Sequence, residues 1–167
     1  MFIVKEKPLP GSEAILTGYI QEPSDEMGDM AKKPAVLVCP GGAYLFTSDR
    51  EAEPIALAYA ARGFQAFVLR YAVARDALGC KPLREASAAI GLMRRQAQAW
   101  HLDADKIATV GFSAGGHLAA WVGLCGENKP NAIVLCYPAL EIVPEGGGQA
   151  RPNPLATMLL GEGYTQA

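Results

Sequence analysis

The stretch Gly111-Phe112-Ser113-Ala114-Gly115-Gly116 decides which fold the sequence predicts. An apolar run at residues 107–110 leads directly into this stretch, and residues 117–122 continue from it with the composition of a helix. A G-x-S-x-G motif between a strand and a helix is typical of a nucleophile elbow, a sharp turn that lifts the serine hydroxyl clear of the backbone. Glycines are needed at its flanks because the turn crowds its neighbours. We therefore expect Ser113 to be a nucleophile.

Two other interpretations of this glycine-rich stretch are weaker. It has the composition of an ordinary glycine-rich helix start with an incidental serine, but the strand before it and the helix after it favour the elbow. A dinucleotide-binding fingerprint requires G-x-G-x-x-G. Ser113 occupies the position of the second glycine, so we reject that interpretation.

Short apolar runs alternate with amphipathic stretches along the rest of the chain. Continuous apolar runs are typical of strands that are covered on both faces. Alternating strands and helices predict a parallel sheet with helices on both sides. We expect a three-layer α/β/α sandwich with a mostly parallel sheet. The expected strands are residues 2–4, 14–20, 35–39, 64–71, 107–112 and 132–137, and the expected helices are residues 53–62, 82–100 and 113–125, with a short helical stretch at 155–160.

Composition narrows the classes of partner and location. The 167 residues carry a formal net charge of −2, and no basic block indicates nucleic-acid binding. No apolar run reaches the roughly 20 residues of a membrane helix, and the N-terminus lacks a signal-peptide pattern. The four cysteines form no C-x-x-C pair, which favours reduced thiols over disulfides or zinc ligands. We expect a cytoplasmic protein without cofactor or metal.

A second glycine-rich segment, Pro40-Gly41-Gly42-Ala43-Tyr44, follows the apolar run at residues 35–39. Acyl transfer builds negative charge on a carbonyl oxygen and needs N–H donors waiting for it. In a fold with a nucleophile elbow, one donor is the residue after the nucleophile, here Ala114, and another comes from the loop after the third strand. Pro-Gly-Gly alone is more often a simple turn, but its place ahead of the elbow favours an oxyanion loop.

Together these segments resemble one family. The chain is similar to the esterase and deacetylase branch of the α/β-hydrolases, the acetyl-xylan-esterase-like and hormone-sensitive-lipase-like enzymes. Relatives often have His-Gly-Gly-Gly where this chain has Pro-Gly-Gly-Ala. The segments that carry the resemblance are Pro40-Gly41-Gly42-Ala43-Tyr44, Leu69-Arg70-Tyr71, Leu102-Asp103-Ala104-Asp105-Lys106-Ile107, GFSAGGHLAA at 111–120, and Cys136-Tyr137-Pro138.

The resemblance implies roles for particular residues. Carried over by position, Ser113 is the nucleophile, and the amides of Gly42, Ala43 and Ala114 are the oxyanion donors. Tyr44 and Phe112 are expected to line the substrate pocket. Core packing is an equally good interpretation of Phe112.

In this family the serine nucleophile works with an acidic residue and a histidine as a catalytic triad. Neither partner has a matching residue in this sequence. In this fold they follow the nucleophile, in that order, and such a domain often runs to about 250 residues. His101 is expected at the amino end of the sheet, away from the site. His117, four residues after Ser113, is expected to be packed and hydrogen-bonded on the elbow helix. We therefore expect residues 1–167 to form a single α/β-hydrolase domain that is incomplete at its C-terminal end.

Two functions stay open on this basis. The first is a serine carboxylic-ester hydrolase that removes acetyl or another short acyl group from a sugar or small alcohol. The alternative is a non-catalytic remnant that binds a ligand or a complementing partner chain. Peptidase and thioesterase chemistry also stay open, because the elbow fixes acyl transfer and not the leaving group. The apolar residues 132–140 predict a bare sheet edge. We expect dimerisation into a homo-oligomer, aggregation, or a partner chain at this edge.

Overall fold

The apolar runs of the sequence form one six-stranded sheet. The structure is a computed structural model that describes residues 1–27 and 32–140. The expected helix at residues 155–160 lies outside the described residues. The elements are β1 (Phe2–Glu6), β2 (Ile15–Ile20), η1 (Asp25–Met27), β3 (Lys33–Cys39), η2 (Asp49–Glu51), α1 (Glu53–Ala60), β4 (Gln65–Arg70), η3 (Ala74–Ala77), α2 (Lys81–Arg95), β5 (Leu102–Phe112), α3 (Ala114–Cys125) and β6 (Ala132–Cys136).

The strands lie in the order β1-β2-β4-β3-β5-β6. β4, β3, β5 and β6 run parallel to one another, whereas β2 is antiparallel to both β1 and β4. Cys39 pairs with Gly111 across β3 and β5. This register brings the two glycine-rich segments to the same edge of the sheet, since each begins where its strand ends.

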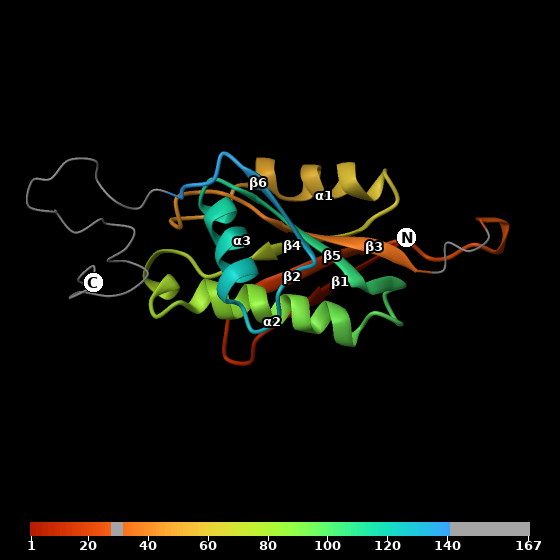
Figure 1. The fold of residues 1–167 in the computed structure, drawn as a ribbon, viewed down its shortest axis with the longest axis horizontal. Coiled ribbons are helices and arrows are strands. Elements are labelled where there is room, and N and C mark those ends of the chain that lie inside the picture. Colours follow the sequence, from red (N-terminus) through yellow and green to blue (C-terminus); the bar gives the residue numbers. More distant parts are fainter. Residues whose placement is uncertain (28–31, 141–167) are drawn as a thin grey trace, which may run out of the picture.

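Helices cover both faces of this sheet (Figure 1). Side chains of successive strand residues point to opposite faces, and β3 shows this directly. Leu37 belongs to the core cluster that contains residues of α2 and α3, whereas Val36 and Val38 belong to the cluster that contains Ala56 of α1. The predicted three-layer α/β/α sandwich with a mostly parallel sheet is confirmed.

The boundary between α2 and β5 differs from the prediction. α2 ends at Arg95, where residue 100 was expected, and β5 begins at Leu102, where residue 107 was expected. Leu102 pairs with Lys33 across a register shift in β3, which lengthens the strand. Because the turn between the elements is held by buried Gln65, whose amide donates to the carbonyl of Trp100 at 2.9 Å, periodicity along the chain does not reveal it.

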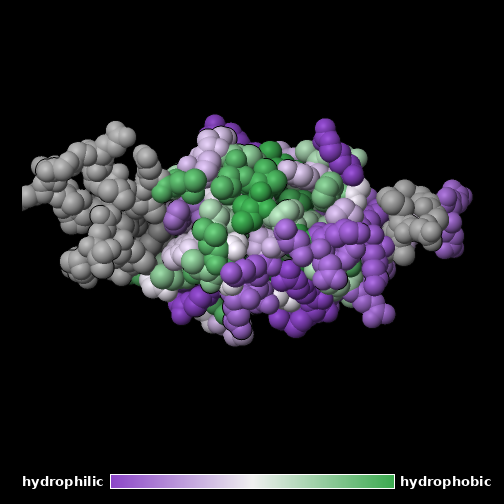
Figure 2. All heavy atoms as spheres, viewed as in Figure 1, coloured by the Kyte–Doolittle hydropathy of each residue, from purple (hydrophilic) through white to green (hydrophobic). Residues whose placement is uncertain are grey.

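β6 lies at the edge of the sheet and pairs only with β5 among the residues that the structure describes. Its side chains Ile133, Val134 and Leu135 are each about 40% exposed (39%, 43% and 39%). Figure 2 shows hydrophobic side chains gathered over β6 between α1 and α3. In the described part of the chain, no helix is long and apolar enough to cross a membrane.

Candidate active site

Ser113 occupies the turn between β5 and α3. Its backbone has φ 50° and ψ −115°, a conformation that a non-glycine residue adopts only where its surroundings enforce it. A Cβ on Gly111 would lie 2.1 Å from the carbonyl oxygen of Gly115, and one on Gly115 would lie 2.0 Å from that of Cys39. Real side chains do not tolerate such distances, so the two glycines of the motif let α3 close over the ends of β3 and β5.

The backbone of Ser113 is held from two sides. Its N–H donates to the carbonyl of Cys136 at 3.1 Å, and its carbonyl accepts from the amides of His117 at 3.0 Å and Ala139 at 3.1 Å. The segment after β6 therefore fixes the elbow, while the Ser113 side chain stays half-buried. Rigid support of this kind is what holds a nucleophile in one orientation.

The segment Pro40–Tyr44, which we call the glycine loop, runs beside this turn. A Cβ on Gly41 would lie 3.2 Å from Cβ of Ser113. Gly42 has φ 132°, and Ala43 and Tyr44 have φ 53° and 58°, so three successive residues adopt left-handed conformations. Successive backbone amides in such turns form concave sites for anions.

The amides of the glycine loop divide into two groups. The N–H of Gly41 donates to Glu51 Oε2 at 2.7 Å. No hydrogen bond within residues 1–27 and 32–140 engages the amides of Gly42 and Ala43. Ala114 is the first residue of α3, and the first N–H groups of a helix have no partner inside it. The three residues predicted as oxyanion donors are thus brought to one edge of the sheet with Ser113.

Tyr44 lies elsewhere than predicted. It is fully buried, and its hydroxyl lies 2.9 Å from Nδ1 of His117, so its placement differs from that of a pocket wall. Its ring meets Tyr71 edge-on at 5.7 Å, and the hydroxyl of Tyr71 donates to the carbonyl of Pro40 at 2.5 Å. Burial raises the pKa of both phenols. The left-handed backbone at Tyr44 turns its ring inward, where it supports the loop.

Phe112 is half-buried and stacks obliquely on exposed Tyr137, with ring centroids 5.9 Å apart. Phe112 also packs against the core cluster that contains Val110, and its place in a pocket wall stays a prediction. The sequence did not predict that Tyr137 lies beside Phe112, because the two meet only where β6 joins the sheet beside β5.

Both histidines lie where the sequence predicts. His117 is packed between Tyr44 and Trp121, and burial lowers the pKa of its imidazole. His101 immediately precedes β5, at the amino end of the sheet. Among the described residues, no hydrogen bond joins either ring to the hydroxyl of Ser113. No group of three or more His, Cys, Asp or Glu side chains could hold a metal ion in this part of the chain.

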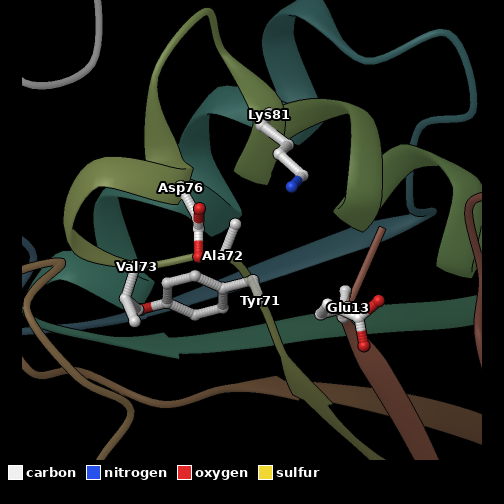
Figure 3. A pocket seen from close by; sticks show the side chains of 7 residues that line it. Glu13, Tyr71, Ala72, Val73, Asp76 and Lys81 are labelled. Carbon is white, nitrogen blue, oxygen red and sulfur yellow. The ribbon is translucent and has the colours of Figure 1, made fainter. Parts of the chain in front are cut away.

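A small cavity of about 150 Å³ lies beside Tyr71, and neither Ser113 nor the glycine loop contributes to its walls. Figure 3 shows the acidic groups of Glu13 and Asp76 and the ammonium of Lys81 around it, with the Tyr71 ring along one side. Its size and its position outside the elbow separate it from the candidate active site.

Comparison with known proteins agrees with the fold. The BD-FAE family model matches residues 20–141. A solved structure of MGS-M1, an α/β-hydrolase enzyme from a Medee basin deep-sea metagenome library, is 50% identical with a TM-score of 0.80, over 83% of this chain and 57% of that one. The acetyl ester-xyloside bifunctional hydrolase from Caldicellulosiruptor lactoaceticus is 30% identical with a TM-score of 0.71, over 87% of this chain and 60% of its own.

A curated relative is matched over a smaller share of its own length. Endo-1,4-beta-xylanase B from Butyrivibrio fibrisolvens is 29% identical over 128 residues, which is 67% of this chain and 20% of that protein. The chain therefore spans about a fifth of this relative and somewhat under two thirds of the two solved structures.

Proposed function

Because the chain belongs to the BD-FAE family of α/β-hydrolases, we propose that it carries the nucleophile and oxyanion hole of a serine carboxylic-ester hydrolase. The main support is the conformation of Ser113, which is held in a left-handed turn at the carboxyl end of β5 beside the glycine loop. Backbone strain stored at one serine is a feature of functional sites.

In this proposal Ser113 Oγ attacks the ester carbonyl while its proton passes to the general base. The base returns the proton to the leaving oxygen, so that the alcohol departs and an acyl-enzyme remains. The amides of Gly42, Ala43 and Ala114 receive the negative charge that develops on the carbonyl oxygen. α3 begins at Ala114, so the positive end of its dipole points at the same charge. Water then releases the acid.

A short acyl group on a sugar or a small alcohol is the substrate we propose. The support comes from relatives whose names refer to acetyl ester, xyloside and xylan substrates. Half-buried Phe112 and exposed Tyr137 offer an aromatic surface next to Ser113. The four free cysteines support a cytoplasmic location, since thiols stay reduced there.

The general base is proposed to come from a complementing segment or chain, because the sequence holds two histidines. His117 is paired with Tyr44, and His101 lies at the opposite end of β5. Losing the histidine of a serine triad costs about 10⁶ in kcat, while the oxyanion hole retains about 10³ over water. The same observation favours the second candidate, a non-catalytic domain that binds a ligand or a partner.

The test is acetylation of the 167-residue chain by p-nitrophenyl acetate, followed by intact mass and peptide mapping. We expect one acetyl group on Ser113, formed faster when imidazole is added as an external base. Ser113→Ala should lose this label, and Ser24→Ala, a change at an exposed serine, should keep it. Equal labelling of wild type and Ser113→Ala would contradict the esterase proposal and favour the non-catalytic candidate.

A further inference from the structure

The carboxylate of Glu51 joins two segments that flank Ser113. Its Oε2 accepts the N–H of Gly41 at 2.7 Å, and its Oε1 accepts the hydroxyl of Tyr137 at 2.6 Å. Gly41 belongs to the glycine loop after β3, and Tyr137 directly follows β6. These are the two segments that lie on either side of the elbow, because β5 is paired with β3 on one edge and β6 on the other.

Both segments have a strained backbone that needs such support. Ala43 in the glycine loop and Tyr137 after β6 have φ 53° and 37°, and left-handed conformations at non-glycine residues persist only where neighbours hold them. Tyr137 is 65% exposed, so burial does not fix it. The hydrogen bond to Glu51 is the main reason that the pKa of Tyr137 is raised to about 12.

The position of Glu51 also determines which amide of the glycine loop is already hydrogen-bonded. A Cβ on Gly41 would lie 2.7 Å from Glu51 Oε2 and 3.2 Å from Cβ of Ser113, so the carboxylate and the serine are neighbours of the same residue. Glu51 takes up the Gly41 amide, whereas no hydrogen bond among the described residues engages the amides of Gly42 and Ala43. A negative charge beside an oxyanion site opposes the charge that develops there, so electrostatics alone does not explain a glutamate at this place.

We propose that Glu51 is a positioning residue, which holds the glycine loop and the segment after β6 in the geometry that the oxyanion site needs. The inference rests on the proposed function for its catalytic consequence, while its structural part stands on the two hydrogen bonds. Glu51 acts through Gly41 and does not itself touch the substrate.

Amide hydrogen exchange tests the structural part. In Glu51→Ala the Gly41 amide should exchange at least about tenfold faster than in wild type, because it loses its acceptor. The pKa of Tyr137, followed by NMR of ¹³C-labelled tyrosine and assigned with Tyr137→Phe, should fall from about 12 toward 10. Glu51→Gln should keep Gly41 protected, since the carboxamide oxygen accepts from the amide and its NH₂ donates to the tyrosine oxygen.

Serine-dependent acetylation tests the catalytic part. Glu51→Ala should acetylate Ser113 about ten- to a hundredfold more slowly, because a displaced loop misplaces its donors. Glu51→Gln should react at least as fast as wild type, since it keeps the geometry and removes the charge. Asp49→Ala is the matched control, because Asp49 lies in the same short helix η2 with an exposed side chain whose ion pair is with Arg70.

The outcomes separate the two proposals. Unchanged Gly41 exchange in Glu51→Ala overturns the positioning role, as does a Glu51→Gln variant as slow as Glu51→Ala. If wild type shows no acetylation that depends on Ser113, the esterase proposal fails, and the exchange of Gly41 alone then decides whether Glu51 positions the loop. Thermal unfolding of each variant identifies a general loss of fold. If Glu51→Ala does not fold, the exchange of the Gly41 amide in Glu51→Gln decides the positioning role, because a loss of protection there would overturn it.

Discussion

Replacing Gly115 with alanine should separate the elbow from the strand beneath it. A Cβ at this position would lie 2.0 Å from the carbonyl oxygen of Cys39 and 2.4 Å from that of Pro40. Both atoms are backbone at the end of β3, in a part of the sheet where β4 and β5 pair on either side. Neither atom moves out of the way as a side chain would, so α3 and the glycine loop must move apart.

The magnitude follows from two opposing effects. Glycine to alanine inside a helix stabilises it by about 1 kcal/mol. Overpacking a closely packed site costs typically 1–3 kcal/mol, and we take about 3 here because two backbone atoms are involved. The net loss is about 2 kcal/mol in the free energy of unfolding. For a domain of this size, that corresponds to a Tm about 4–8 °C lower.

Gly123→Ala is the matched control, because Gly123 lies in the same helix α3 and the substitution gives the same gain in helix propensity. Its Cβ would meet the Cδ1 of Ile133 at 2.1 Å, but this is the end of a flexible side chain on the exposed edge strand. We expect its stability to stay within about 1 kcal/mol of wild type. The measurement is urea and thermal unfolding by circular dichroism. Equal stabilities for the two variants would refute the close approach of α3 to β3.

Three further predictions concern the surroundings of the site. Tyr44→Phe should cost about 1–2 kcal/mol in urea unfolding, because it removes the partner of His117 Nδ1 in a buried setting; an unchanged midpoint would contradict that bond. Burial lowers the pKa of His117 below its ordinary 6.5, so the unfolded chain binds this proton more tightly. Stability should therefore fall as the pH drops below 6.5 and level off below the folded-state pKa; His117→Gln should lack this component, and an identical pH profile would refute it. We also propose that β6 edges pair between copies: the wild-type chain should self-associate in light scattering and Val134→Lys should shift it toward monomer, whereas a monomeric wild type would count against the edge as an interface.

The strand and helix order and the elbow were predictable because they depend on local patterns. Apolar runs and the G-x-S-x-G motif each extend over a few residues. In the structure the motif lies where they predict it, with Ser113 between β5 and α3. Glu51 was missed because it lies in a polar stretch without periodicity. Its partners Gly41 and Tyr137 are 10 and 86 residues away, and only the strand order brings them together. Tyr44 was assigned to the wrong surroundings for a related reason, since its backbone conformation decides where its ring points.

If Ser113 is the nucleophile of an esterase, its hydroxyl faces the amides of Gly42 and Ala43 in the glycine loop. A crystal structure after reaction with a p-nitrophenyl alkylphosphonate tests it most directly, because the phosphoryl oxygen mimics the tetrahedral oxyanion. We expect phosphorus bonded to Ser113 Oγ, with the phosphoryl oxygen about 3 Å from the amides of Ala114 and of Gly42 or Ala43. An adduct at another residue would rule out Ser113 as the nucleophile, and a phosphoryl oxygen that contacts none of these amides would rule out the oxyanion site.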